Sequence, residues 1–117
     1  MPSREKFNIR EQLQRLERHL AETEENPVLF FAQITREEPG ITPERIKGTE
    51  STADICFWRK AYFYVLAKAY HPTLPFKAIG EHYAPYTDWR NVKTGFDVIQ
   101  GYIEAYNIRA KALPPKA

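Results

Sequence analysis

Cysteine, glycine and long apolar runs are all scarce in this chain of 117 residues, and each scarcity excludes a class of protein. A single cysteine cannot build an internal disulfide framework, and it favours a reducing compartment. Only 5 glycines and few segments of alternating polarity argue against an all-β fold. No segment approaches the roughly 20 apolar residues of a membrane span, and the N-terminus lacks the apolar core of a signal peptide. We therefore expect a soluble, cytoplasmic protein without membrane contact.

Residues that could bind a metal or support catalysis are present but scattered. The three histidines lie far apart in the sequence, at His19, His71 and His82. None has a cysteine or carboxylate at ligand spacing, so we expect no metal site. Cys56 stands beside large aromatic residues and is interpreted as a small buried side chain. The adjacent acidic pairs Glu24–Glu25 and Glu37–Glu38 should point their side chains apart. We expect neither an enzyme nor a cofactor.

Composition is compatible with one ordinary domain. Hydrophobic residues make up 43% of the chain, which is enough for a core and argues against wholesale disorder. The formal net charge is only +2. Because this value is too small to identify a nucleic-acid partner, the distribution of the charges along the chain has to decide that question.

The first 25 residues predict a separate amphipathic helix, from about Ser3 to Thr23. Its apolar stripe recurs at helical spacing and consists of Ile9, Leu13, Leu16 and Leu20. Charged residues flank this narrow seam on both sides. Two interpretations stay open: the helix packs on its own domain, or it forms a homodimer contact.

Residues 26–110 predict the main helical domain, and residues 111–117 a frayed tail. Asn26-Pro27 and Thr42-Pro43 each predict a capped helix start. Ser51–Asp54 is similar to a capping box and opens the strongest helix, from Thr52 to about Tyr70. One side of this helix should form the core of the domain.

The segment from Thr73 to Tyr106 predicts a short helix, a break and a longer helix. Ala84-Pro85-Tyr86 forces the break, and Asp88 can cap the second helix. The second helix has an apolar side formed by Val92, Phe96, Ile99 and Ile103. Together these patterns predict an all-α domain of about five helices that contains a helix-turn-helix.

The start of the last helix carries the candidate base contacts. These residues are Arg90, Asn91, Lys93 and Thr94. Arginine or lysine can read guanine and asparagine can read adenine in the major groove. Asp97, further along the same side, should repel phosphate and limit the contact to the first two turns. The alternative interpretation is an ordinary solvated helix face.

A locally basic segment precedes these residues. No acidic residue occurs from Ile55 through Gly80, although the chain as a whole is nearly neutral. We predict that the basic residues of this segment and two polar residues of the following turn contact DNA phosphates: Arg59, Lys60, Lys68, Lys77, Tyr86 and Thr87.

The pattern formed by several of these residues also resembles that of a known protein family. The matching positions are Arg59–Lys60, Val65–Lys68, Thr73–Leu74, Ile79–Gly80, Tyr83 and Thr87–Val92. The segment from about Ile34 to Ile103 resembles the C-terminal helix-turn-helix domain of the bacterial replication initiator DnaA, in the Trp-repressor-like group. The resemblance implies binding to double-stranded DNA, in bacterial replication or transcription control. The family's ATPase domain has no counterpart, because no P-loop motif occurs.

The second functional hypothesis is a helical protein–protein interaction module that has lost DNA binding. The family's base-contacting arginine, histidine and threonines are replaced here, which favours this hypothesis. It predicts an exposed apolar patch of several hundred Å² around Phe57, Phe63 and Tyr64.

Overall fold

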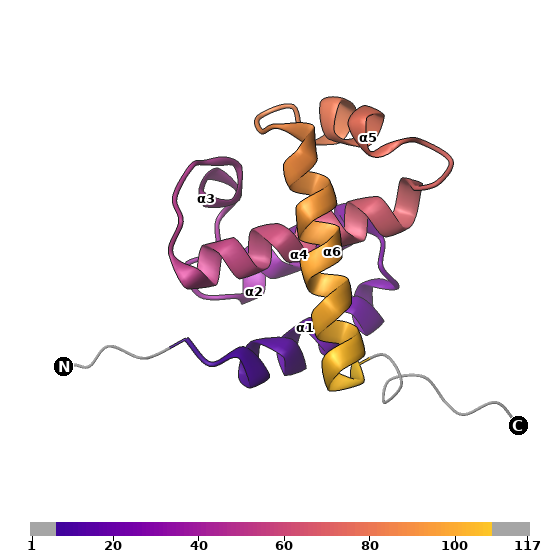
Figure 1. Ribbon diagram of the computed structural model, residues 1–117. Coiled ribbons are helices and arrows are strands. Elements are labelled where there is room, and N and C mark those ends of the chain that lie inside the picture. The colour runs from indigo at the N-terminus through magenta and orange to yellow at the C-terminus, as the bar shows by residue number, and fades with distance from the viewer. Residues whose placement is uncertain (1–6, 109–117) are drawn as a thin grey trace, which may run out of the picture.

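Six α-helices make up the computed structural model, which describes residues 7–108 (Figure 1). They are α1 (Ile9–Thr23), α2 (Pro27–Glu37), α3 (Pro43–Lys47), α4 (Ala53–Tyr70), α5 (Phe76–Tyr83) and α6 (Trp89–Tyr106). No strand occurs in this part of the chain, so the predicted all-α class is confirmed. The predicted tail at residues 111–117, and the first residues of the predicted N-terminal helix, lie outside the described range.

Local capping signals set most of the helix starts. The Asn26 side chain accepts hydrogen bonds from the backbone N–H groups of Val28 and Leu29, and Thr42 accepts one from Arg45. The capping box predicted at Ser51–Asp54 does not form. Thr52 is the N-cap residue but makes no side-chain cap, and its hydroxyl donates to the Asp54 carboxylate.

Helix α4 is the centre of the domain and packs against α2, α3, α5 and α6. In Figure 1, α6 crosses in front of α4, while α2 lies along its other side. Gly95 permits the crossing, since a Cβ there would lie 2.9 Å from the Phe63 Cβ and 3.2 Å from the Lys60 Cα. The leucines of α1 are buried in the same core as α2 and α4, so the apolar seam of α1 packs within its own domain.

The predicted apolar surface patch is wrong. Phe57, Phe63 and Tyr64 are only 4%, 2% and 1% exposed. The prediction assigned one buried side to α4, but a helix at the centre of a domain is covered on several sides. None of the helices described in residues 7–108 is long and apolar enough to cross a membrane.

Candidate nucleic-acid interface

The junction between α5 and α6 positions the predicted DNA-binding residues. Helix α5 ends at Tyr83, and residues 84–88 lead into α6. Asp88 caps α6, and its Oδ1 accepts a hydrogen bond from the backbone N–H of Arg90 at 2.9 Å. Gly80 of α5 lies directly against Trp89 of α6. The two helices are therefore held in close contact, with the first turns of α6 exposed beside the junction.

Arg90, a predicted base contact, is highly exposed but already paired. Its side chain is 72% exposed, yet the guanidinium binds Asp88 through Nε at 3.1 Å and Nη2 at 2.7 Å. The side-chain and backbone hydrogen bonds from Arg90 lower the pKa of Asp88 to about 2. The Asp88 carboxylate is therefore ionised near neutral pH, where it holds Arg90 and offsets its charge.

The neighbouring side chains are also paired locally. Lys93 Nζ lies 2.8 Å from an Asp97 carboxylate oxygen, one turn further along α6. Asn91 Nδ2 donates to Thr87 Oγ1 at 2.7 Å. All of the predicted base contacts are exposed on α6. To bind a nucleic acid, Arg90, Asn91 and Lys93 would have to leave their present partners within the protein.

A pocket of about 310 Å³ separates the start of α6 from α4 and from the loop between α3 and α4. We call it the α4–α6 pocket, and its lining residues are Gly48, Thr49, Arg59, Lys60, Phe63, Tyr86, Thr87, Asn91 and Thr94. Six of the predicted DNA contacts are among them, and no acidic residue is. The predicted base contacts Asn91 and Thr94 thus share one cavity with four predicted phosphate contacts.

Arg59 is fixed by the backbone at the end of α3. Its guanidinium donates hydrogen bonds of 2.8 Å to the carbonyl oxygens of Arg45, Ile46 and Glu50. These bonds close the C-terminal end of α3 and hold a positive charge at the wall of the α4–α6 pocket. The sequence predicted a phosphate contact here and did not anticipate the structural role.

Tyr86 contributes the one buried side-chain polar atom within residues 7–108 that lacks a hydrogen-bond partner, its hydroxyl. Burial raises the pKa of Tyr86 above its usual range, Tyr62 adds to the rise, and the positive charge of Arg59 opposes it. The hydroxyl therefore keeps its proton near neutral pH and is a potential donor without an acceptor.

The three predicted phosphate-contacting lysines differ in position but share one property. Lys60 lines the α4–α6 pocket, whereas Lys68 is exposed near the end of α4 and Lys77 is exposed on α5. None of the three forms an ion pair with a carboxylate of the described residues. Their charges are therefore available to an anionic partner.

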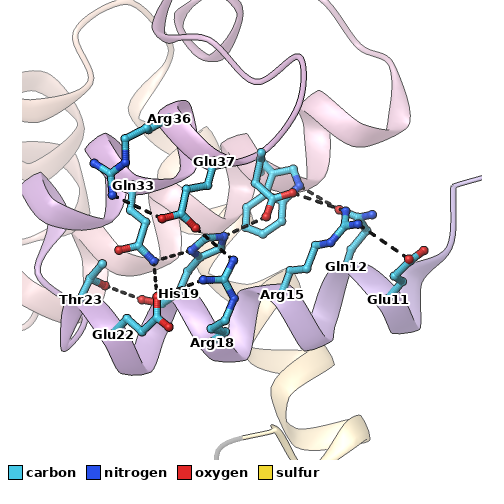
Figure 2. Close-up of polar contacts among 12 residues, drawn as sticks. Glu11, Gln12, Arg15, Arg18, His19, Glu22, Thr23, Gln33, Arg36 and Glu37 are labelled. Atoms are coloured by element: carbon cyan, nitrogen blue, oxygen red, sulfur yellow. Dashed lines mark hydrogen bonds and ion pairs between the residues drawn. The ribbon is translucent and has the colours of Figure 1, made fainter.

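The structure also contains a buried polar cluster that the sequence did not predict. His19 of α1 is fully buried, and its Nε2 lies 2.8 Å from Glu38 Oε2. Its Nδ1 lies 2.7 Å from Gln33 Nε2, which also donates to Glu22 Oε1 at 2.8 Å (Figure 2). Because Glu22 fixes the orientation of the Gln33 amide, Nδ1 accepts a hydrogen bond and Nε2–H donates to Glu38.

The adjacent residues Glu37 and Glu38 diverge, as the sequence indicated. Glu37 remains at the surface and binds Arg18 at 3.1 Å (Figure 2), whereas Glu38 is buried with His19. Trp58 stands edge-on to the His19 ring, with the ring centroids 5.6 Å apart. Since His19 is fully buried against residues of α2 and α4, this cluster joins α1, α2 and α4.

A second pocket, of about 580 Å³, lies beside the first turns of α1 and α4. Its lining includes the carboxylates of Glu11, Glu38 and Asp54, but Arg15 is its only cation. This excess of acidic groups makes it a poor surface for a phosphate backbone. No group of three or more histidine, cysteine or acidic side chains suited to a metal ion occurs in the range 7–108.

Sequence reasoning missed Gly48 and Thr49, which complete the α4–α6 pocket from the loop after α3. Gly48 caps the end of α3, but no signal in the sequence links this loop to the start of α6. Comparisons of the chain with protein-family models, with curated proteins and with solved structures found no match.

Proposed function

We propose that this protein binds double-stranded DNA, with α5 and α6 as a helix-turn-helix and the first turns of α6 in the major groove. The observation that carries the proposal is the α4–α6 pocket, which gathers six predicted DNA contacts around a cavity without an acidic lining residue. Helix α6 is also held against α5 and α4 at two glycines, Gly80 and Gly95, which gives it a defined position.

The charge distribution supports the same proposal. Lys60, Lys68 and Lys77 have no carboxylate partner among the described residues, whereas Arg18 of α1 and Arg45 of α3 each pair with two carboxylates. Unpaired lysines can neutralise phosphates without first losing an internal ion pair. Arg90 and Lys93 can approach the bases by exchanging their exposed carboxylate partners.

Binding to a random duplex at low salt tests the proposal directly. We expect fluorescence anisotropy to show binding at micromolar protein, with the affinity falling as salt rises because counterions are released. Lys77→Ala should reduce the salt slope by about 1, whereas Arg36→Ala, on the exposed surface of α2, should not. Absence of binding at micromolar protein and low salt would rule the proposal out.

Asp88→Asn is expected to strengthen DNA binding. Asparagine is also a good N-cap, so α6 should keep its start, while Arg90 is released and one negative charge is removed. At low salt the affinity should rise roughly fivefold, because an exposed negative charge beside the duplex is removed. Competition anisotropy with the two proteins measures this ratio.

The matched control for that variant is Glu104→Gln, which removes one negative charge from the same helix. Glu104 lies about 24 Å along α6 from Asp88, beyond the Debye length of roughly 10 Å at 0.1 M salt. Equal gains from the two substitutions would show that net charge alone changes the affinity, and would argue against Arg90 as a DNA contact.

The proposed function is that of a bacterial, cytoplasmic protein in replication or transcription control, as the resemblance to the DnaA domain implies. A homodimer through α1 would have to use its exposed flank, because Leu13, Leu16 and Leu20 are buried in the protein's own core. Sedimentation analysis at micromolar concentration distinguishes a dimer from a monomer.

A protein–protein interaction module is the second candidate. Two adjacent apolar residues at the start of α2, Val28 and Leu29, are 74% and 56% exposed. The pairing of Arg90 and Lys93 with carboxylates is also consistent with this candidate. It predicts no duplex binding, and loss of a protein partner on replacing Val28 and Leu29 by serine.

A further inference from the structure

We propose that the α4–α6 pocket binds a single phosphate group of the DNA backbone, and that Asn91 and Thr94 bind this phosphate instead of reading bases. This inference rests on the proposed function, and it changes the role of two of the four predicted base contacts. The ligand chemistry is that of a phosphate, for which a DNA phosphodiester and free inorganic phosphate are the two possible sources.

The lining of the pocket matches an anion rich in acceptors. Lys60 and Arg59 supply positive charge, and no carboxylate lines the cavity to oppose it. Arg59 uses three of its five N–H groups on backbone carbonyls, so its position is fixed and two N–H groups remain. Threonine hydroxyls from the loop and from α6 add neutral donors. A cation held in place before binding loses little conformational freedom when the phosphate arrives.

The Tyr86 hydroxyl supplies a second, independent observation. Tyr86 lines the pocket from the α5–α6 turn, and its hydroxyl is buried and lacks a hydrogen-bond partner. A buried polar group without a partner destabilises the free protein. A phosphate oxygen in the pocket would provide the missing acceptor, so ligand binding would remove a defect that the fold otherwise retains.

The geometry of α6 separates phosphate binding from base reading. Successive residues of a helix are 100° apart, so Asn91 and Thr94 lie on one edge of α6, which faces α4, and Thr87 of the preceding turn lines the same pocket. Lys93 lies at the opposite edge, with Nζ 5.8 Å from the centre of the Phe76 ring of α5. Arg90 is between these edges. We expect the DNA backbone to pass along the edge of α6 that faces α4. Arg90 and Lys93, on the rest of the exposed surface of α6, are then the residues that can contact the bases.

A titration followed by ¹⁵N–¹H NMR spectroscopy tests the pocket with two probes, inorganic phosphate and a random duplex. Binding is expected to shift the backbone amide signals of Thr49, Thr87 and Thr94, and phosphate is expected to compete with the duplex at these positions. Shifts with phosphate but not with the duplex would show that the pocket binds an anion. They would overturn the inference that DNA supplies the phosphate, and with it the proposed function. Duplex binding without shifts in the pocket would overturn this inference alone. Shifts with neither probe would overturn both.

Thr94→Val tests the phosphate contact without a change in charge. Thr94 is exposed, and valine has nearly the same shape, so the fold should be retained. We expect duplex affinity to fall roughly tenfold, equally for all sequences, since a hydrogen bond to a charged group is lost. Thr73→Val, at an exposed threonine outside the pocket, is the control and should change nothing. If Thr94→Val instead weakened binding only to duplexes with a particular base pair, Thr94 would be a base contact and the inference would be overturned.

Tyr86→Phe provides a readout that a purely structural role would not give. Removing the unpartnered hydroxyl should leave the melting temperature of the free protein equal or higher, while duplex affinity falls several-fold. Tyr102→Phe, at a half-buried tyrosine outside the pocket, should leave affinity unchanged. A lower melting temperature with unchanged affinity would show that the Tyr86 hydroxyl serves the fold, and would contradict the proposal.

Discussion

Replacing His19 by alanine is expected to lower the free energy of unfolding by about 3–5 kcal/mol, because a fully buried ring and its hydrogen bond to a carboxylate are both lost. The substitution removes the N–H donor 2.8 Å from Glu38 and leaves that carboxylate buried, with Arg15 at 3.5 Å as its remaining partner. It also opens a cavity between Phe30 and Trp58, both of which are in edge contact with the imidazole ring. Urea denaturation followed by circular dichroism measures the loss.

A double-variant cycle separates the loss of the Glu38 contact from the loss of the imidazole itself. The double variant His19→Ala, Glu38→Ala should be less destabilised than the sum of the two single variants, by about 0.5–3 kcal/mol. Additive losses would show that the pair is not coupled.

The helix boundaries were predictable because their signals are local. Asn26-Pro27 and Thr42-Pro43 start α2 and α3, and both side-chain caps form as expected. A cap depends on residues two or three positions away, so its energy is encoded within one turn. The exception is Thr52, which occupies the N-cap position of α4 without a side-chain cap, although its residue type is favoured there.

The sequence predicted only part of the burial of α4, because the spacing of apolar residues was interpreted as marking a single buried side. Trp58 and Val65 of α4 are buried in the core. Phe63 was assigned to the surface, but α6 covers it at the Gly95 crossing. Which helix covers a second apolar side depends on packing between segments distant in sequence.

Long-range polar pairings set the limit of prediction for the candidate site. Arg59 was recognised as a cation, but its bonds to the end of α3 join residues 9 to 14 positions apart through a turn that the sequence does not specify. The i,i+4 pair of Lys93 and Asp97 was within reach of sequence reasoning, because such pairs face each other on a helix. The α4–α6 pocket was not, since three separate segments form it.

The close contact of α5 with α6 gives the second large expected effect, for Gly80→Ala. A Cβ at Gly80 would lie 2.5 Å from the Cβ and 2.6 Å from the Cα of Trp89. Backbone atoms cannot rotate away as a side chain can, so α5 and α6 must separate. We expect the free energy of unfolding to fall by about 1–3 kcal/mol, as for other overpacked sites. Chemical denaturation measures the change.

Gly101→Ala is the matched control for that substitution, because it also places an alanine inside a helix. No atom lies within 4 Å of the added Cβ at Gly101, so only the gain in helix propensity should act. This variant should be more stable by about 0.5–1 kcal/mol. Changes of opposite sign in the free energy of unfolding would therefore separate the contact between α5 and α6 from helix propensity.

If DNA binding depends on this contact, Gly80→Ala should also weaken duplex binding under conditions where the variant remains folded, whereas Gly101→Ala should not. A stabilised Gly80→Ala variant would contradict the close approach of the two helices on which the proposed groove contact depends.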